Sequence, residues 1–72
     1  MRDWRRIVGD NVRTLRLAKG MTQERLAFAS ELDLTYVGGI ERGRRNPSLL
    51  VMARIAEALD ATLADLIRDS TT

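Results

Sequence analysis

The sequence of 72 residues predicts an all-α fold of five short helices. Apolar residues recur every three or four positions, and no segment alternates apolar and polar side chains for long enough to suggest a strand. Glycines, the single proline and short polar residues divide the chain into helix-sized segments. A chain of this length forms one domain, residues 1–72, with frayed ends expected at 1–3 and 69–72.

The first part of the chain contains two of the predicted helices. One spans about residues 4–19 and ends before Gly20, which supplies a left-handed cap. The other spans about residues 23–30 and begins after Thr22, whose hydroxyl is suited to cap a helix start. It is short, barely two turns.

The third predicted helix follows after only three residues, 31–33. It spans about residues 34–42, with Asp33 as its N-cap and Gly43 at its end. The next segment, RGRRNPS, holds the only proline and is the clearest loop in the chain.

Two helices complete the predicted fold. The fourth reaches about residue 59 and is capped by either Asn46 or Ser48. Thr62 and Asp65 have the spacing of a capping box, which opens a last helix over residues 63–67. The apolar faces of the helices predict a small core: Val8, Val12, Leu26, Val37, Ile40, Met52, Ile55 and Leu59.

Composition excludes several classes of function. The chain has no cysteine and no histidine, so it can form no disulfide, no thiolate-zinc site and no histidine base. Its carboxylates lie scattered on charged helix faces without a nucleophile beside them. We therefore expect no enzyme activity, no metal and no cofactor. No apolar run approaches the roughly 18 residues of a spanning helix, so we expect no membrane partner and a cytoplasmic location.

The charges have an uneven distribution that the net value of +2 conceals. Eleven of the 12 basic residues are arginine, whose planar group suits contact with oxyanions such as phosphate. Residues 1–25 carry seven basic and three acidic side chains, whereas residues 46–72 carry two basic and four acidic ones. Arg2, Arg5 and Arg6 could form an arm that touches DNA or a solvated helix start.

Two short helices joined by a three-residue turn and followed by an arginine-rich loop form a helix-turn-helix arrangement. The segment MTQERLAFASELDLTYVGGIERGRRNPSLLVMARIAEALDATLADL closely resembles the helix-turn-helix family of the Cro and lambda repressors. Within that family, the motif Thr-Tyr-Val followed by Gly-Ile-Glu-Arg resembles the one found in controller proteins of restriction-modification systems. The resemblance implies a compact lambda-repressor-like domain that binds double-stranded DNA.

The resemblance also implies which residues contact DNA. The third predicted helix would be the recognition helix in the major groove. Its outward-facing reading positions are Leu34, Thr35, Gly38 and Gly39. The residues expected to contact phosphates lie in the first predicted helix, at the start of the second and in the arginine-rich loop: Arg16, Thr22, Gln23, Arg44, Arg45 and Asn46.

A further implied contact is a pair between Arg16 and Glu41 that orients the recognition helix; the alternative is an ordinary surface ion pair. Glu31 stands where the family's turn usually has glycine, at a cost of roughly 1–2 kcal/mol if its backbone is left-handed. Because the two glycines offer bases no side chain, we expect phosphate contacts and DNA shape to dominate affinity.

Apolar residues off the core stripes predict self-association. Leu50, Val51, Leu63, Leu66 and Ile67 could form a patch for a two-fold dimer, which would set two recognition helices about 34–36 Å apart. The alternative is that the last helix covers these residues within one chain.

The sequence therefore predicts a homodimeric, sequence-specific regulator that binds a palindromic operator and takes no small-molecule ligand. The alternative function is a protein-interaction module of the same fold, an antitoxin or coactivator-like adaptor.

Overall fold

The computed structural model describes residues 1–69 as five helices. These are α1 (Trp4–Ala18), α2 (Gln23–Ser30), α3 (Leu34–Glu41), α4 (Leu49–Ala58) and α5 (Leu63–Ile67). No strand occurs in this part of the chain. All five predicted helices and the all-α class are confirmed, with ends that differ by at most one residue. Residues 70–72, most of the predicted frayed C-terminus, lie outside the described residues.

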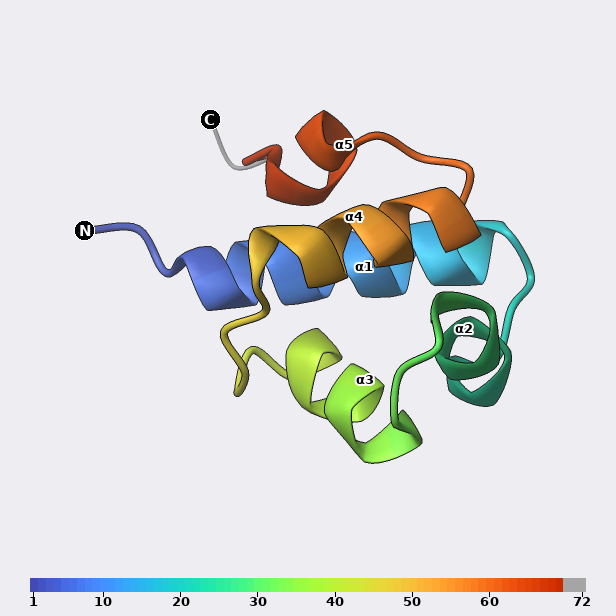
Figure 1. Ribbon diagram of the computed structural model, residues 1–72. Helices are drawn as coiled ribbons and strands as arrows, with labels where there is room; N and C mark the ends of the chain where they lie inside the picture. The colour runs from blue at the N-terminus through green and yellow to red at the C-terminus, as the bar shows by residue number, and fades with distance from the viewer. Residues whose placement is uncertain (70–72) are drawn as a thin grey trace.

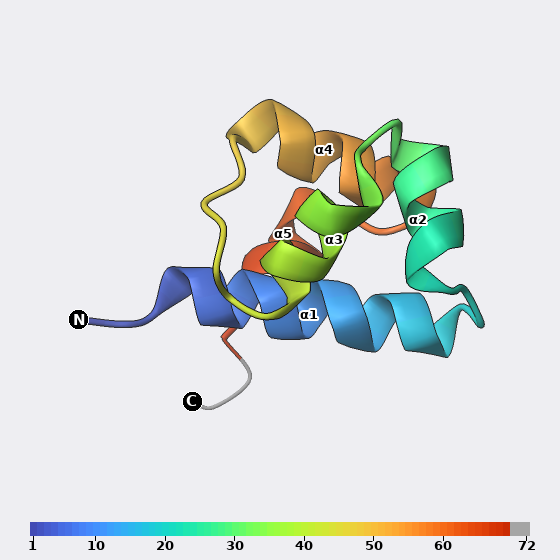
Figure 2. The same ribbon diagram turned by 90° about the horizontal axis from the view of Figure 1, so that it is seen from below.

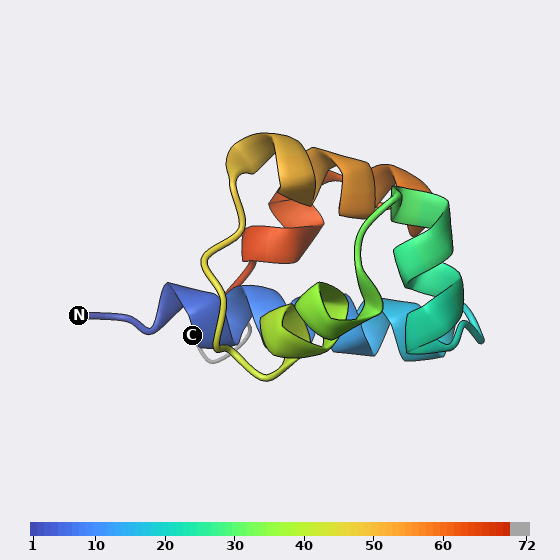
Figure 3. The same cartoon turned by 60° about the horizontal axis from the view of Figure 1, so that its bottom comes forward.

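The helices form a block of about 32 × 20 × 19 Å. α1 packs against α3 and α5, while α2 packs against α3 and α4 (Figures 1 and 2). Seen from below, α3 and α5 lie between α1 and α4, and α2 closes the end away from the termini (Figure 2). This arrangement leaves one side of α3 at the surface, with the α3–α4 loop running beside it (Figure 3).

The core is formed by apolar side chains from all five helices. The buried ones are Val8, Val12, Leu26, Ala27, Val37, Ile40, Ile55, Ala56, Leu59 and Leu66. This confirms seven of the eight predicted core residues, whereas Met52 is only partly buried. Leu66 corrects the predicted dimer patch: its side chain is 0% exposed, because α5 folds over the core and turns this residue inward.

Four helices end in the same hydrogen-bonded motif. After α1, α2, α3 and α4, one residue in the left-handed region is followed by an amide that donates to a carbonyl five residues back. After α1 and α3 that residue is a glycine, with φ of 72° at Gly20 and 73° at Gly43. After α2 and α4 it is Glu31, with φ of 58°, and Asp60, with φ of 54°. The predicted strain at Glu31 is therefore present.

Helix starts follow the predicted capping pattern with one exception. The Thr22 hydroxyl accepts from the Arg25 amide at 3.0 Å, and Thr62 with Asp65 forms the complete capping box. Ser48, not Asn46, caps α4. Asp33 occupies the N-cap position of α3 but its side chain makes no capping hydrogen bond, which corrects the sequence prediction.

Gly9 allows α3 to rest directly on α1. A Cβ atom at Gly9 would lie 2.2 Å from the backbone oxygen of Ile40 and 3.0 Å from that of Glu41. The first distance is far shorter than a carbon-oxygen contact permits and the second is unusually tight, so only glycine fits between the two backbones without a shift. The sequence analysis did not single out this position, although it sets the depth at which α3 packs.

Candidate nucleic-acid interface

Two of the four predicted reading residues of α3 are exposed. Leu34 and Thr35, in its first turn, are exposed as expected for reading positions. Gly38 and Gly39 are buried. Neighbouring side chains lie across both glycines, and the role of the glycines as reading positions stays a prediction.

Two arginines from beyond the helix cover the glycines. A Cβ at Gly38 would lie 3.1 Å from Nη1 of Arg42, and one at Gly39 would lie 2.8 Å from Cγ of Arg45. The guanidinium carbon of Arg45 is also 5.5 Å from the centre of the Tyr36 ring, within cation-π range. Because Gly38 and Gly39 have no side chains, the side chains of Arg42 and Arg45 can lie across the surface of α3 at these positions.

A buried ion pair joins α1 to the end of α3. Nε of Arg16 donates to Oε2 of Glu41 at 2.7 Å, and Nη2 donates to Oε1 at 3.1 Å. Nη1 of Arg16 donates to the Met21 carbonyl at 2.8 Å, and Nε2 of Gln23 donates to Oε1 of Glu41 at 3.0 Å. Arg16 and Glu41 are 7% and 5% exposed. The structure therefore brings together the pair that the sequence suggested and adds Gln23 to it.

This network changes the prediction for two phosphate contacts. Arg16 directs all three of its guanidinium nitrogens at partners inside the protein, so it is a buried link between helices and not a surface phosphate ligand. The Gln23 side chain is likewise engaged by Glu41. The groups at the start of α2 that can still bind a phosphate are backbone amides. Thr22 caps the helix, and the first amides of a helix have no partner within the helix.

A polar hollow of about 380 Å³ lies between α1 and the end of α3. Four arginines line it, Arg6 and Arg13 from α1 with Arg42 and Arg44 from the end of α3. Asp10 and Glu41 also line it, but the charge of Glu41 is already matched by Arg16. Within residues 1–69, none of the four arginines has a carboxylate partner. The hollow is therefore electropositive.

The sequence analysis missed this hollow because its arginines lie far apart in the chain. The predicted loop residues Arg44, Arg45 and Asn46 are exposed. Of the N-terminal arginines, Arg6 joins the hollow, whereas Arg2 forms an ion pair with Asp69.

The turn between α2 and α3 is held from outside by Arg54 of α4. Its Nε donates to the Ser30 carbonyl at 3.0 Å, and Nη2 donates to the Glu31 carbonyl at 2.6 Å. These bonds satisfy the last carbonyls of α2 and stabilise the left-handed backbone of Glu31. The orientation of α3 relative to α2 thus depends on a residue in the fourth helix.

The residues of the predicted dimer patch do not share one environment. Leu50 is 75% exposed and Ile67 is 47% exposed. Val51 and Leu63 are half-buried, and Leu66 belongs to the core. Leu49, which was not predicted, is 62% exposed at the start of α4.

Residues 1–69 contain neither a metal-ligating cluster nor a membrane-spanning helix. No group of three or more histidine, cysteine, aspartate or glutamate side chains is placed to hold a metal ion there. No helix in that part is long and apolar enough to cross a membrane.

Comparison with known proteins identifies the family. Residues 12–66 match the model of a helix-turn-helix family, HTH_3. This range includes α2, the turn and α3 in full. The chain belongs to the HTH_3 helix-turn-helix family.

Other HTH_3 proteins match this one over most of their length. The control protein C.BamHI of Bacillus amyloliquefaciens is 46% identical over 64 residues, which cover 88% of this chain and 79% of that protein. The HTH-type transcriptional regulator y4dJ of Sinorhizobium fredii is 38% identical over 90% of this chain and 84% of its own.

A solved HTH_3 structure gives the same result. The restriction-modification controller protein C.AhdI of Aeromonas hydrophila has a TM-score of 0.84 and 50% identity, covering 86% of this chain and 94% of that one. The resemblance to controller proteins and the predicted class of DNA-binding regulator are confirmed.

Proposed function

We propose that this HTH_3 protein regulates transcription as a homodimer on a palindromic operator, without catalytic activity. The observation that carries the proposal is a concentration, around α3, of arginines that have no carboxylate partner within residues 1–69: Arg6, Arg13, Arg42, Arg44 and Arg45. Burying such cations against an apolar surface would leave them without counter-charges, whereas DNA supplies a phosphate for each. A cytoplasmic location fits this activity.

α3 has the dimensions of a recognition helix. Its eight residues give a length of about 12 Å at 1.5 Å per residue, comparable to the width of the major groove. With α3 in the groove, the start of α2 faces one strand, and its free amides bind a phosphate there. The arginine-lined hollow adjoins the start of α2, because Gln23 also lines it, and it binds further phosphates together with the loop residues Arg44 and Asn46.

Base reading depends on three side-chain types. Thr35 offers a hydroxyl, and Leu34 offers apolar contact with a thymine methyl group. Arg42 and Arg45 lie over the glycines, so their guanidinium groups occupy the positions from which longer helix side chains would read bases. A guanidinium that reaches guanine forms two hydrogen bonds to it. The proposal thus assigns direct base readout to Arg42 and Arg45. The sequence analysis had predicted no side chain at the glycine positions and a phosphate contact for Arg45.

The salt dependence of binding tests the proposal. The logarithm of the affinity should fall linearly with the logarithm of salt concentration, with a slope near −0.9 for each phosphate contacted. Arg44→Gln should weaken all DNA sequences alike and reduce the slope by about 1. Arg68→Gln, which removes an exposed arginine from the opposite side of the fold, is the matched control and should leave the slope unchanged.

Substitution of the reading arginines separates readout from charge. Arg42→Gln should cost about 1–3 kcal/mol at one base pair of the operator and relax specificity there. An equal loss on every sequence would show that Arg42 contacts phosphate only. An affinity that does not change with salt would contradict DNA binding and favour the protein-interaction module.

A further inference from the structure

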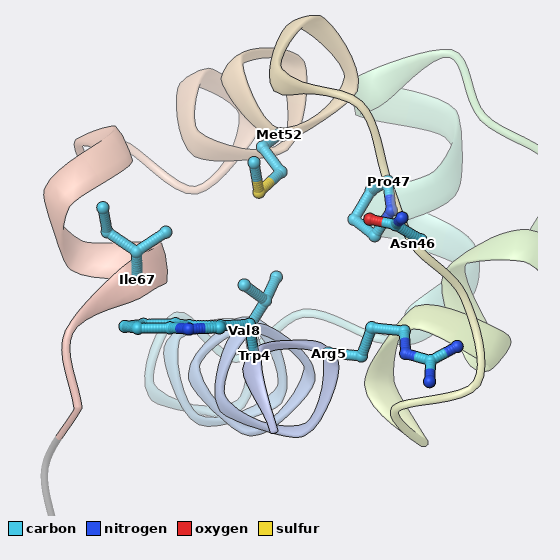
Figure 4. A pocket seen from close by; sticks show the side chains of 7 residues that line it. All are labelled: Trp4, Arg5, Val8, Asn46, Pro47, Met52 and Ile67. Carbon is cyan, nitrogen blue, oxygen red and sulfur yellow. The ribbon is translucent and has the colours of Figure 1, made fainter. Parts of the chain in front are cut away.

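Two sides of α4 carry different chemistry. Met52 points into an apolar pocket that it lines together with Trp4 and Ile67 (Figure 4). Arg54 follows two residues later, about 200° further around the helix, and so faces the other way. Its side chain reaches the turn between α2 and α3 (Figures 2 and 3). The function proposed above assigns no role to Arg54.

The end of α2 leaves carbonyl groups that the helix itself cannot satisfy. The amides of Glu31 and Leu32 donate back to two carbonyls in the last turn of the helix. The carbonyls of Ser30 and Glu31 accept instead from Nε and Nη2 of Arg54, at 3.0 and 2.6 Å. One planar guanidinium group therefore binds both carbonyls at which the chain leaves α2.

These two hydrogen bonds lie on either side of one strained residue. The Ser30 carbonyl belongs to the peptide plane before Glu31, and the Glu31 carbonyl belongs to the plane after it. Fixing both planes fixes φ and ψ of Glu31 together, and its φ of 58° is in the left-handed region that favours glycine. Arg54 therefore stabilises a backbone conformation that Glu31 does not favour by itself.

The charges of the two side chains contribute little to this contact. The Glu31 carboxylate is 3.8 Å from Nη2 of Arg54, and its side chain is 86% exposed. Ion pairs this open to water add little stability. The contact acts through the backbone of the turn, so Glu31→Gln removes the charge and leaves the clamped carbonyls in place.

We propose that Arg54 is a positioning residue for DNA recognition, because it fixes the angle at which α3 leaves the turn. The proposal rests on the function proposed above, in which α3 lies in the major groove. Reading a base requires a side chain such as Thr35 at hydrogen-bond distance from one base edge, whereas phosphate contacts carry no sequence information. Arg54 therefore contributes to the affinity for the operator and not to the affinity for DNA in general.

Titration of two DNA duplexes tests the proposal. The unchanged protein selects one duplex from a random-sequence pool, and the other is a scrambled sequence of the same length and composition. Arg54→Met keeps the aliphatic stem and removes both hydrogen bonds. At a temperature where circular dichroism shows both proteins folded, it should bind the selected duplex about 10-fold more weakly and the scrambled one within about twofold, with an unchanged salt slope.

Two results of this titration would overturn the proposal. A salt slope smaller by about 1 would show that Arg54 binds a phosphate itself. Equal losses on both duplexes would show that Arg54 supports only the fold. Arg54→Lys keeps the charge but lacks the fork that reaches two carbonyls, so it should behave like Arg54→Met, and full retention of specificity would contradict the role of the fork. Glu31→Gln is the matched control and should bind both duplexes as the unchanged protein does.

Urea unfolding measures the same contact without DNA. Because glycine adopts the left-handed backbone without support, Arg54→Met should lower the folding equilibrium constant several-fold less in a Glu31→Gly background than in the unchanged protein. Asp60→Gly is the matched background, since Asp60 has φ of 54° but lies in the turn between α4 and α5. There Arg54→Met should keep its full effect. Equal effects in the two glycine backgrounds would overturn the proposal.

The outcome is separable from the function proposed above. If the protein binds its selected duplex with the expected salt slope but Arg54 shows no coupling to Glu31, only the role of Arg54 fails. If the coupling is present but the unchanged protein selects no duplex, the contact stands as a feature of the turn. The DNA-binding function then fails, and the positioning role fails with it.

Discussion

Replacing Arg16 by methionine would test whether the buried ion pair holds α3 in place. The change keeps the length and apolar stem of the side chain but removes two hydrogen bonds to Glu41 and one to the Met21 carbonyl. Glu41 would remain 5% exposed with Gln23 as its partner. Breaking one side of a buried pair costs about 3–5 kcal/mol. The total stability expected for a chain of this length is roughly 4–11 kcal/mol.

Urea unfolding followed by far-ultraviolet circular dichroism measures this loss. With a slope of about 1 kcal/mol per molar urea, the midpoint of Arg16→Met should fall by roughly 3–5 M. The double variant Arg16→Met with Glu41→Leu removes both charges and should be clearly more stable than the single variant. A loss below about 1 kcal/mol for Arg16→Met, or a double variant no more stable than the single one, would refute the reasoning.

Three further changes have expected outcomes. Gly9→Ala places a Cβ 2.2 Å from the Ile40 oxygen, so α3 must move. We expect a loss of about 1–3 kcal/mol in urea unfolding and weaker operator binding in titration, and unchanged values for both would be inconsistent with the close contact. Glu31→Gly relieves a left-handed backbone and should raise stability by about 1 kcal/mol, part of the gain being offset by glycine's freedom when unfolded. The thermal midpoint would rise by roughly 4–8 °C, and a lower midpoint would contradict the strain. The hydrogen bond from the Thr62 backbone amide lowers the pKa of Asp65 below its ordinary 3.8. The stability that this carboxylate contributes is present above pH 3.8 and lost as the pH falls below it, so Asp65→Asn should flatten the acid side of the stability curve. Parallel curves for the two proteins would show that Asp65 makes no such contribution.

Local signals in the sequence were enough to predict the helices. Caps such as Thr22 and Thr62, the glycines after α1 and α3, and the three-residue turn act through hydrogen bonds between residues close together in the chain. Their effect does not depend on the rest of the fold. Asp33 is the N-cap residue of α3, as the sequence predicted. Its side chain, however, makes no capping hydrogen bond.

The candidate site was predicted less completely than the helices. The order of motifs placed α3 at the surface and paired Arg16 with Glu41, because the family pattern contains both positions. It could not show that Gln23 turns inward to Glu41, or that Arg13 meets Arg42 at one hollow. Those contacts depend on how deeply α3 packs against α1, which follows from the space left at Gly9.

The sequence by itself determined that this chain forms five helices, contains a helix-turn-helix and carries an excess of basic over acidic side chains in residues 1–25. Only the tertiary structure decided which side chains remain available. It buried Leu66, covered Gly38 and Gly39 with arginines, and left Leu49 exposed at the start of α4. The physical reason is that a helix is built from contacts within four or five residues, whereas exposure depends on partners distant in the sequence, which no local pattern encodes.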